Sequence, residues 1–109
     1  MNNGTKVKAA ATVVLLPDRV DSSTSSAVEK LMMEALQPGA RVIVDGSAVI
    51  YMSAAGVRAL ATVLHRAPEK QARLAFCRFS SAAADCLLVS GFTDLLDVVA
   101  TVEEASDRL

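Results

Sequence analysis

The sequence is poor in aromatic residues and has no excess of either charge. It contains no tryptophan, one tyrosine and three phenylalanines, so 4% of the 109 residues are aromatic, whereas 52% are hydrophobic. The core must therefore consist of aliphatic side chains, chiefly Ala, Val, Leu and Met. Eleven basic and twelve acidic residues give a formal net charge of -1, so no basic field for nucleic acid is expected.

Long hydrophobic runs and clustered cysteines are also absent. The longest apolar runs, such as residues 9–16, are too short to cross a bilayer, so we expect no direct membrane insertion. Cys77 and Cys86 lie in apolar surroundings without CxxC spacing. They are expected to be buried free thiols rather than a disulfide or a metal pair, which indicates a reducing compartment. We therefore predict a cytoplasmic protein.

Residue patterns typical of enzymes are missing as well. The one histidine, His65, is predicted to be exposed beside the buried stripe of a helix, and neither a GxSxG nor an HExxH motif occurs. Gly46 and Gly56 stand alone, so the sequence has no Gly-rich phosphate loop. Without a base beside a nucleophile, no catalytic residue is expected.

The carboxylates that could serve as ligands are scattered at the predicted strand ends. Asp18, Asp21 and Asp45 are interpreted as turn and cap residues. Metal sites need clustered His, Cys or carboxylate groups at defined spacing. We therefore expect neither a metal nor a cofactor.

Hydrophobic periodicity predicts alternating strands and helices. Residues 6–16 form one strand or a hairpin, and a helix follows the hydroxyl-rich cluster 21–26. The other expected elements are strands at 41–46, 74–77 and 95–99 and helices that start near 53, 80 and 101. This order predicts a single α/β domain over residues 1–109, with a small, mixed, mostly parallel sheet and about four α-helices.

Two of these helices carry particular local signals. The first has an apolar stripe at helical spacing, which consists of Ala27, Val28, Leu31, Met32, Ala35 and Leu36. The last begins with Thr101-Val102-Glu103-Glu104, which has the Thr-x-x-Glu form of a capping box. We expect the stripe to be buried and the Thr101 side chain to cap its helix.

The segment YMSAAGVRAL, residues 51–60, joins an apolar run to a helix through one hydroxyl group and three very small residues. We predict that Ser53 is the N-cap of this helix, with its side-chain oxygen within hydrogen-bond reach of the N–H of Ala55 or Gly56. Small residues at 54–56 let the backbone of a partner protein approach closely, or they let the helix pack tightly on the sheet. The two explanations are compatible.

Several segments together resemble the STAS domain, which occurs in bacterial anti-sigma factor antagonists and at the C-termini of sulfate transporters. The segments that carry this resemblance are LPDRVDS at 16–22, VIVDG at 42–46, YMSAAGVRAL at 51–60, SGFTDL at 90–95 and VEEA at 102–105. In the first of them, Pro-Asp replaces the usual glycine. The resemblance covers nearly the whole chain and implies a small sheet flanked by helices.

The resemblance also implies a role in partner switching. In this family the unphosphorylated antagonist binds a serine-kinase anti-sigma factor, phosphorylation of a hydroxyl residue just before the glycine breaks that complex, and a phosphatase restores it. Aligned on Gly56, the usual hydroxyl positions fall on Ala54 and Ala55, and Ser53 falls where the family often has aspartate. Alanine cannot accept phosphate, so phosphorylation control is either absent or moved to Ser53.

We therefore predict a non-enzymatic regulatory binding module whose partners are an anti-sigma factor serine kinase and a cognate phosphatase. The predicted docking residues are Asp21, Ser22, Tyr51, Met52, Ser53, Ala54, Ala55, Gly56 and Arg58. Ser53 is interpreted as a helix cap and as a candidate phosphoacceptor. Arg58 either pairs with an acidic group on the partner or is an ordinary exposed arginine.

Two other functions are compatible with parts of this pattern. A STAS subunit of a membrane transporter complex would also explain the missing phosphoacceptors, and nothing in the chain separates it from an antagonist. A small nucleotide-binding or enzymatic domain is disfavoured, because the chain lacks both a base beside a nucleophile and a phosphate loop.

Overall fold

Strands and helices alternate along the chain, as the sequence predicts. The computed structural model describes residues 11–79 and 98–109. Its elements are β1 (Thr12–Leu15), β2 (Arg19–Val20), α1 (Ser25–Ala35), β3 (Arg41–Asp45), β4 (Tyr51–Met52), α2 (Ala54–Arg66), a 3-10 turn (Pro68–Lys70), β5 (Arg73–Cys77), β6 (Val98–Val99) and α4 (Val102–Asp107). The expected helix that starts near residue 80, and Cys86 within it, lie outside the described residues.

Four of the strands form one sheet in the order β1-β3-β5-β6, and β2 pairs with β4 in a separate two-stranded sheet. All of these described pairs are parallel. The central strand β3 is flanked by β1 and β5, so that Val44 lies between Val14 and Phe76. A parallel sheet needs crossover connections, and among the described elements α1 lies between β1 and β3 and α2 lies between β3 and β5.

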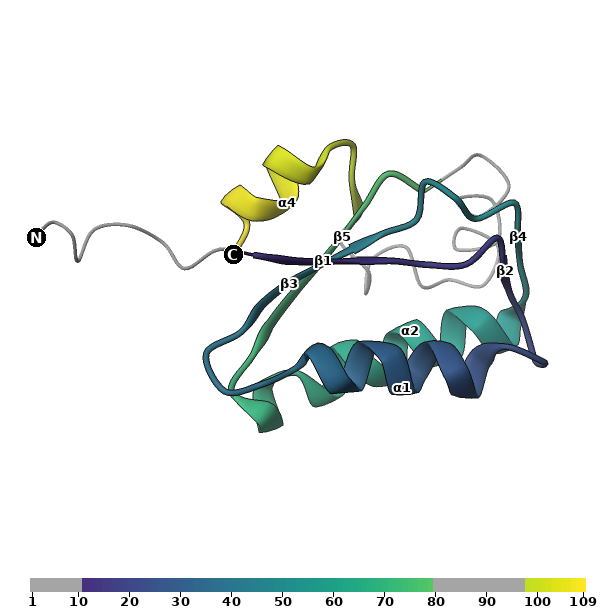
Figure 1. The fold of residues 1–109 in the computed structure, drawn as a ribbon, viewed down its shortest axis with the longest axis horizontal. Coiled ribbons are helices and arrows are strands. Elements are labelled where there is room, and N and C mark those ends of the chain that lie inside the picture. Colours follow the sequence, from purple (N-terminus) through teal and green to yellow (C-terminus); the bar gives the residue numbers. More distant parts are fainter. Residues whose placement is uncertain (1–10, 80–97) are drawn as a thin grey trace, which may run out of the picture.

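The helices cover both faces of the four-stranded sheet. Helices α1 and α2 lie side by side on one face, and the short helix α4 lies on the other (Figure 1). The alternation of strand β3 serves this arrangement: Val42 and Val44 belong to the larger core beneath α1 and α2, whereas Ile43 belongs to a smaller core beneath α4. A strand that is buried on both faces must be apolar throughout its middle, as this one is.

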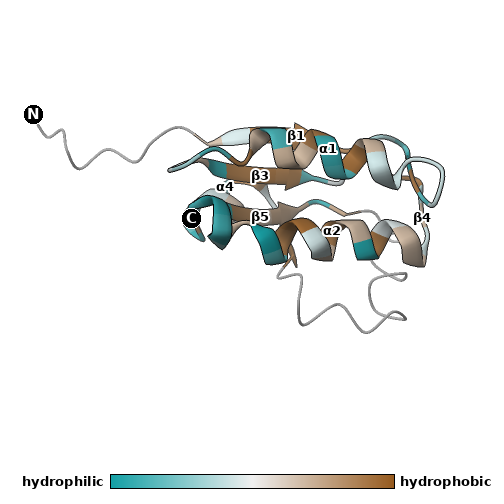
Figure 2. Cartoon of the chain, turned by 90° about the horizontal axis from the view of Figure 1, so that it is seen from below, coloured by the Kyte–Doolittle hydropathy of each residue, from teal (hydrophilic) through white to brown (hydrophobic). Residues whose placement is uncertain are grey.

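The larger core is aliphatic, as the composition predicts, and Phe76 is its one fully buried aromatic residue among the described residues. Strand β3 is largely hydrophobic (Figure 2), and its Val42 and Val44 share the larger core with buried residues of α1 and α2. Cys77 is a buried free thiol, as expected. Burial raises the pKa of the Cys77 thiol, which keeps it protonated and unreactive.

Helix α1 buries a narrower stripe than the sequence predicts. Val28, Met32 and Leu36 are buried, but Ala27 and Leu31 are exposed. The expectation that all six apolar residues face the core was therefore wrong. The helix contacts the sheet and α2 from one side only, so apolar residues at the margin of the stripe stay in solvent.

The C-terminal helix begins as the sequence predicts. The Thr101 side chain accepts a hydrogen bond from the backbone N–H of Glu104, at 3.0 Å. Ala105 is buried against the sheet, and the Arg41 guanidinium donates to the carbonyl of Ser106 at 2.9 Å. Arg41 thus ties helix α4 to the central strand, and Ala105 packs in the smaller core. None of the helices in the described residues is long and apolar enough to cross a membrane.

Two leucines on neighbouring helices test this assignment of the core. Leu60 on α2 is fully buried, whereas Leu31 on α1 is 45% exposed. We expect Leu60→Ala to lower the free energy of unfolding by about 2–5 kcal/mol, because it leaves a cavity. Leu31→Ala should cost less than about 1 kcal/mol, as surface substitutions do. Urea denaturation measures both values, and equal losses would contradict the assignment.

Candidate docking surface

Two segments that are far apart in sequence meet at one end of the molecule. The backbone N–H groups of Ile50 and Tyr51 donate to the carbonyl of Asp18 at 2.7 and 3.1 Å, and the N–H of Ser53 donates to the carbonyl of Val20 at 3.0 Å. These bonds join the segment that leads from β2 into α1 to the segment that leads from β4 into α2. The structure thereby places the two predicted halves of the docking surface side by side.

Asp21 organises the first of these segments. One oxygen of its carboxylate, Oδ1, accepts hydrogen bonds from the N–H of Ser23 at 3.0 Å, from the hydroxyl of Ser23 at 2.7 Å and from the N–H of Thr24 at 3.2 Å. Its own N–H donates to the Thr24 hydroxyl at 2.9 Å. These bonds fix the turn before α1, so Asp21 is the turn and cap residue that the sequence predicts.

Within the hydroxyl-rich cluster 21–26, the residue that accepts the hydrogen bonds of the helix start is not the N-cap residue itself. The N-cap residue of α1 is Thr24, and its side chain accepts no capping hydrogen bond from the helix. The carboxylate of Asp21 satisfies the nearest N–H groups instead. The bond from the Ser23 hydroxyl is the main reason why the pKa of Asp21 lies below its ordinary value; the two N–H bonds and Arg19 act in the same direction.

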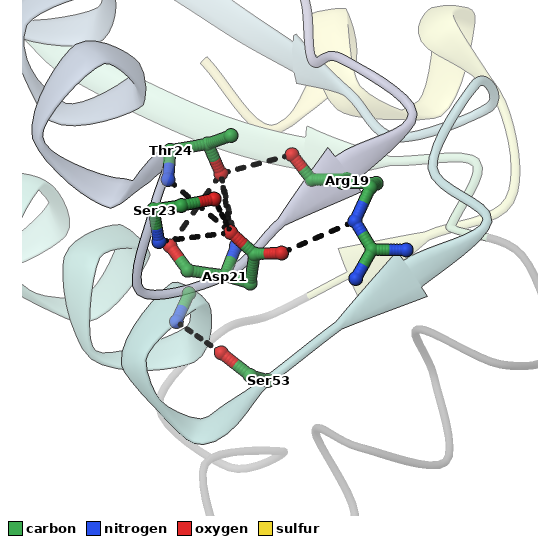
Figure 3. Close-up of polar contacts among 6 residues, drawn as sticks. Arg19, Asp21, Ser23, Thr24 and Ser53 are labelled. Carbon is green, nitrogen blue, oxygen red and sulfur yellow. Dashed lines mark hydrogen bonds and ion pairs between the residues drawn. The ribbon is translucent and has the colours of Figure 1, made fainter.

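Arg19 contacts both segments through its side chain, and Figure 3 shows its hydrogen bond to Asp21. Its Nε donates to the other carboxylate oxygen of Asp21 at 3.2 Å. Its guanidinium carbon lies 4.6 Å from the centroid of the Tyr51 ring, a cation–π contact between β2 and β4. Sequence analysis did not include Arg19 in the site. Its place two residues before Asp21, on the same side of an extended segment, is the signal that could have identified it.

Ser53 caps helix α2 as predicted. Its backbone is extended, with φ -105° and ψ 173°, and its side-chain oxygen accepts a hydrogen bond from the N–H of Gly56 at 3.4 Å. The bond is long, so the cap is at the weak end of its class. The hydroxyl is half-buried and faces the same end of the molecule as Asp21 (Figure 3).

Gly56 is required by the packing of α2 on β2. A Cβ atom at this position would overlap the carbonyl group of Val20. Tight packing of helix on sheet therefore explains the glycine, whereas Ala54 is exposed and Ala55 is half-buried. The explanation by partner docking stays open for the two alanines.

The nine predicted docking residues share one end of the fold but differ in exposure. Four are exposed, two are half-buried and three are buried. The exposed ones are Ser22, Tyr51, Ala54 and Arg58, the half-buried ones are Ser53 and Ala55, and the buried ones are Asp21, Met52 and Gly56. Met52 belongs to the larger core. The buried residues therefore shape the surface, and a partner would touch the others.

One exposed residue beside this set was missed by the sequence analysis. Ile50 precedes Tyr51 and has 66% of its surface exposed, more than any other large hydrophobic residue described. Tyr51 itself is 44% exposed. Adjacent exposed apolar side chains at the end of a strand are typical of interaction sites rather than of core.

The described residues contain no constellation for metal binding or acid–base catalysis. No group of three or more His, Cys, Asp or Glu residues among them could hold a metal ion. His65 is exposed near the opposite end of α2, and Asp45 accepts a hydrogen bond from the N–H of Ser47 at 2.9 Å, as a turn residue does.

Comparison with known proteins agrees with this description. The family model described as STAS domain matches residues 4–105. No protein of curated function matches the sequence significantly. Solved structures do match, at sequence identities that indicate a shared fold alone.

Three of these structures illustrate the range of proteins that share this fold. An anti-sigma factor antagonist from Mycobacterium paratuberculosis has a TM-score of 0.75 and 18% identity, over 88% of this chain and 82% of that one. An anti-sigma factor antagonist (STAS) domain protein from Planctomyces limnophilus has a TM-score of 0.73 and 21% identity, over 87% of this chain and 86% of that one. A sulfate transporter family protein from Wolinella succinogenes has a TM-score of 0.73 and 15% identity, over 94% of this chain and 88% of that one.

The packing role of Gly56 predicts the sign of a mutational effect. Helix propensity alone would make Gly56→Ala stabilising by about 1 kcal/mol. The overlap with Val20 predicts the reverse, a loss of about 1–3 kcal/mol, because a backbone carbonyl cannot move aside cheaply. Thermal or urea denaturation decides between them. Ala54→Ser, at the exposed neighbouring position, is the control and should change stability by less than about 0.5 kcal/mol.

The lowered pKa of Asp21 predicts a loss of stability in acid. Because the folded state holds this carboxylate ionised, its contribution is complete above the ordinary pKa of about 4 and is lost as the pH falls through the lowered value. We expect the wild type to melt at a higher temperature than Asp21→Asn at pH 6, with the difference shrinking below about pH 4. A difference that stayed constant with pH would show that the charge contributes nothing.

Proposed function

The chain belongs to the STAS domain family, and on this premise we propose that it is a regulatory protein-binding module of the anti-sigma factor antagonist type. It would act in the cytoplasm by partner switching with a serine-kinase anti-sigma factor. The observation that carries this proposal is the convergence of the β2–α1 and β4–α2 segments into one surface beside Ser53. Antagonists are among the proteins that share its fold.

The composition of the surface supports a protein partner. Tyr51 and Ile50 provide exposed apolar area, and Arg19 and Arg58 provide donors at its margin. Tyrosine and arginine are enriched in the centres of protein interfaces. Ala54 is exposed without a large side chain, so the N-terminus of α2 is open to close approach.

Phosphorylation control, where it operates, is proposed to act at Ser53. The positions that would carry the family's hydroxyl group are Ala54 and Ala55, which cannot accept phosphate. A phosphate on Ser53 would add roughly -1.5 to -2 charges at neutral pH. It would lie at the N-terminus of α2, which favours negative charge, so the fold should persist. The added bulk and charge would instead disrupt docking.

A transporter-associated role is the second candidate. The observation in its favour is the fold shared with a sulfate transporter family protein, together with the two alanines at the usual phosphoacceptor positions. Such a module would dock permanently and would need no phosphorylation switch. An enzymatic role has no support from the described residues.

Substitutions at Ser53 separate the cap from the switch. Ser53→Ala should lower stability by about 0.5–2 kcal/mol, toward the low end because the capping bond is long, and Ser53→Asp should be nearly neutral, because a carboxylate suits a helix start. Binding is measured by calorimetry against the serine-kinase anti-sigma factor encoded in the same genome. If Ser53 is the switch, Ser53→Asp should weaken binding much more than Ser53→Ala.

Incubation with that kinase and ATP completes the test. The wild type should gain one phosphate by mass spectrometry, and Ser53→Ala should gain none. A phosphate on another residue, or equal binding by both variants, would leave Ser53 as a cap alone. Failure of the wild type to bind the kinase, combined with capture by a transporter subunit, would favour the second candidate.

A further inference from the structure

We propose that Arg19 is the residue through which the docking surface recognises its partner, by binding a carboxylate of the partner next to an apolar contact with Tyr51 and Ile50. This inference rests on the proposed function for the existence of the docking surface, and it adds the chemistry that the surface accepts. The partner it fits is a protein that presents an Asp or Glu side chain beside an apolar residue.

The orientation of Arg19 is fixed from two directions before any partner arrives. The Nε–H donates to Asp21 Oδ2 at 3.2 Å, and the guanidinium carbon lies over the Tyr51 ring, 4.6 Å from its centroid. Asp21 is in turn held by its own bonds to Ser23 and Thr24. An arginine held in this way has lost much of its rotamer freedom already, so binding costs it less entropy.

The donors that Arg19 needs for a carboxylate are left free by this arrangement. A guanidinium carries five N–H donors, and only the Nε–H has a partner among residues 11–79 and 98–109. The side chain keeps 55% of its surface exposed, whereas that of Asp21 keeps 12%. Asp21 therefore occupies the Nε side of the guanidinium. The two terminal nitrogens, without a partner among the described residues, can hold a carboxylate with two parallel hydrogen bonds.

Apolar area lies directly beside these donors. Arg19 pairs with Tyr51 in the register of β2 and β4, and Ile50 precedes it with 66% of its surface exposed. Tyrosine and arginine are both enriched among the few residues that carry most of the binding energy in protein interfaces. A carboxylate that docks there is partly shielded from water by the same side chains, which strengthens the charged hydrogen bonds.

The sequence suggested Arg58 for this role, but among the described residues no contact like those of Arg19 fixes the Arg58 side chain. It is exposed on the first turns of α2, and no ion pair of its side chain occurs within the described part of the chain. An exposed, unrestrained arginine gains little from pairing, because fixing its side chain offsets the attraction. Its charge can steer a partner, whereas Arg19 has the geometry to select one.

The test compares two conservative substitutions, Arg19→Lys and Arg66→Lys. Lysine keeps the charge but lacks the planar fork and its stacking. Arg66, exposed in the last turn of α2 at the end away from Ser53, is the matched control. Against the serine-kinase anti-sigma factor, Arg19→Lys should weaken binding by roughly tenfold or more, and Arg66→Lys should leave it unchanged. Equal melting temperatures would show that both variants are folded.

A second measurement tests the recognition without the kinase. The nitrogen-15-labelled protein is titrated with acetyl-Leu-Glu-amide, and with acetyl-Leu-Gln-amide as the neutral match, and the Arg19 Nε–H resonance is followed. We expect a saturable shift with the Glu peptide alone, accompanied by quenching or enhancement of the tyrosine emission. Tyr51 is the one tyrosine of the sequence, and tryptophan is absent, so that emission reports on this site only.

The two measurements distinguish the possible failures. If the wild type ignores the kinase but the Glu peptide still shifts Arg19, the proposed function is wrong and carboxylate recognition stands. If the kinase binds and Arg19→Lys binds equally well, recognition by Arg19 is wrong and the proposed function stands. Equal responses to the Glu and Gln peptides would overturn the inference whatever the kinase does.

Discussion

The approach of helix α2 to the carbonyl group of Val20 is the contact on which this end of the molecule depends. The carbonyl accepts the N–H of Ser53, and it lies so close to Gly56 that no side chain fits between them. The short strands β2 and β4 have two residues each, too few to hold a surface by their ladder alone. The packing of α2 against β2 therefore helps to hold these two strands in place.

The buried carboxylate of Asp21 at this end of the molecule is stabilised by hydrogen-bond donors around it. Asp21 has only a small exposed surface, and a carboxylate in that position needs compensating donors. Backbone groups, a serine hydroxyl and the Arg19 guanidinium provide them. The same bonds that stabilise the carboxylate orient Arg19 over Tyr51. The hydrogen bonds that the turn requires thus also fix the position of an exposed arginine side chain.

Local patterns in the sequence were enough to predict much of the fold. The alternation of apolar runs with cap and turn residues predicted β1, β3, β5, β6 and the α-helices of the described residues, and Ser53 and Thr101 cap their helices as expected. The two-residue strands β2 and β4 were not predicted. These features depend on neighbours within a few positions, so they can be identified without knowledge of the third dimension. The width of the buried stripe of α1 could not be predicted from the sequence, because it depends on which surfaces the helix contacts.

By itself, then, the sequence determined the aliphatic core, the order of the elements, the cap at Ser53 and the replacement of the usual hydroxyl residues by Ala54 and Ala55. The tertiary structure alone decided what each small or charged residue does. Gly56 serves packing because a carbonyl from a distant strand lies against it. Arg19 becomes part of the surface because parallel pairing of β2 with β4 brings Tyr51 beneath its guanidinium. Contacts between distant segments form only when the chain folds, and a one-dimensional pattern does not contain their distances.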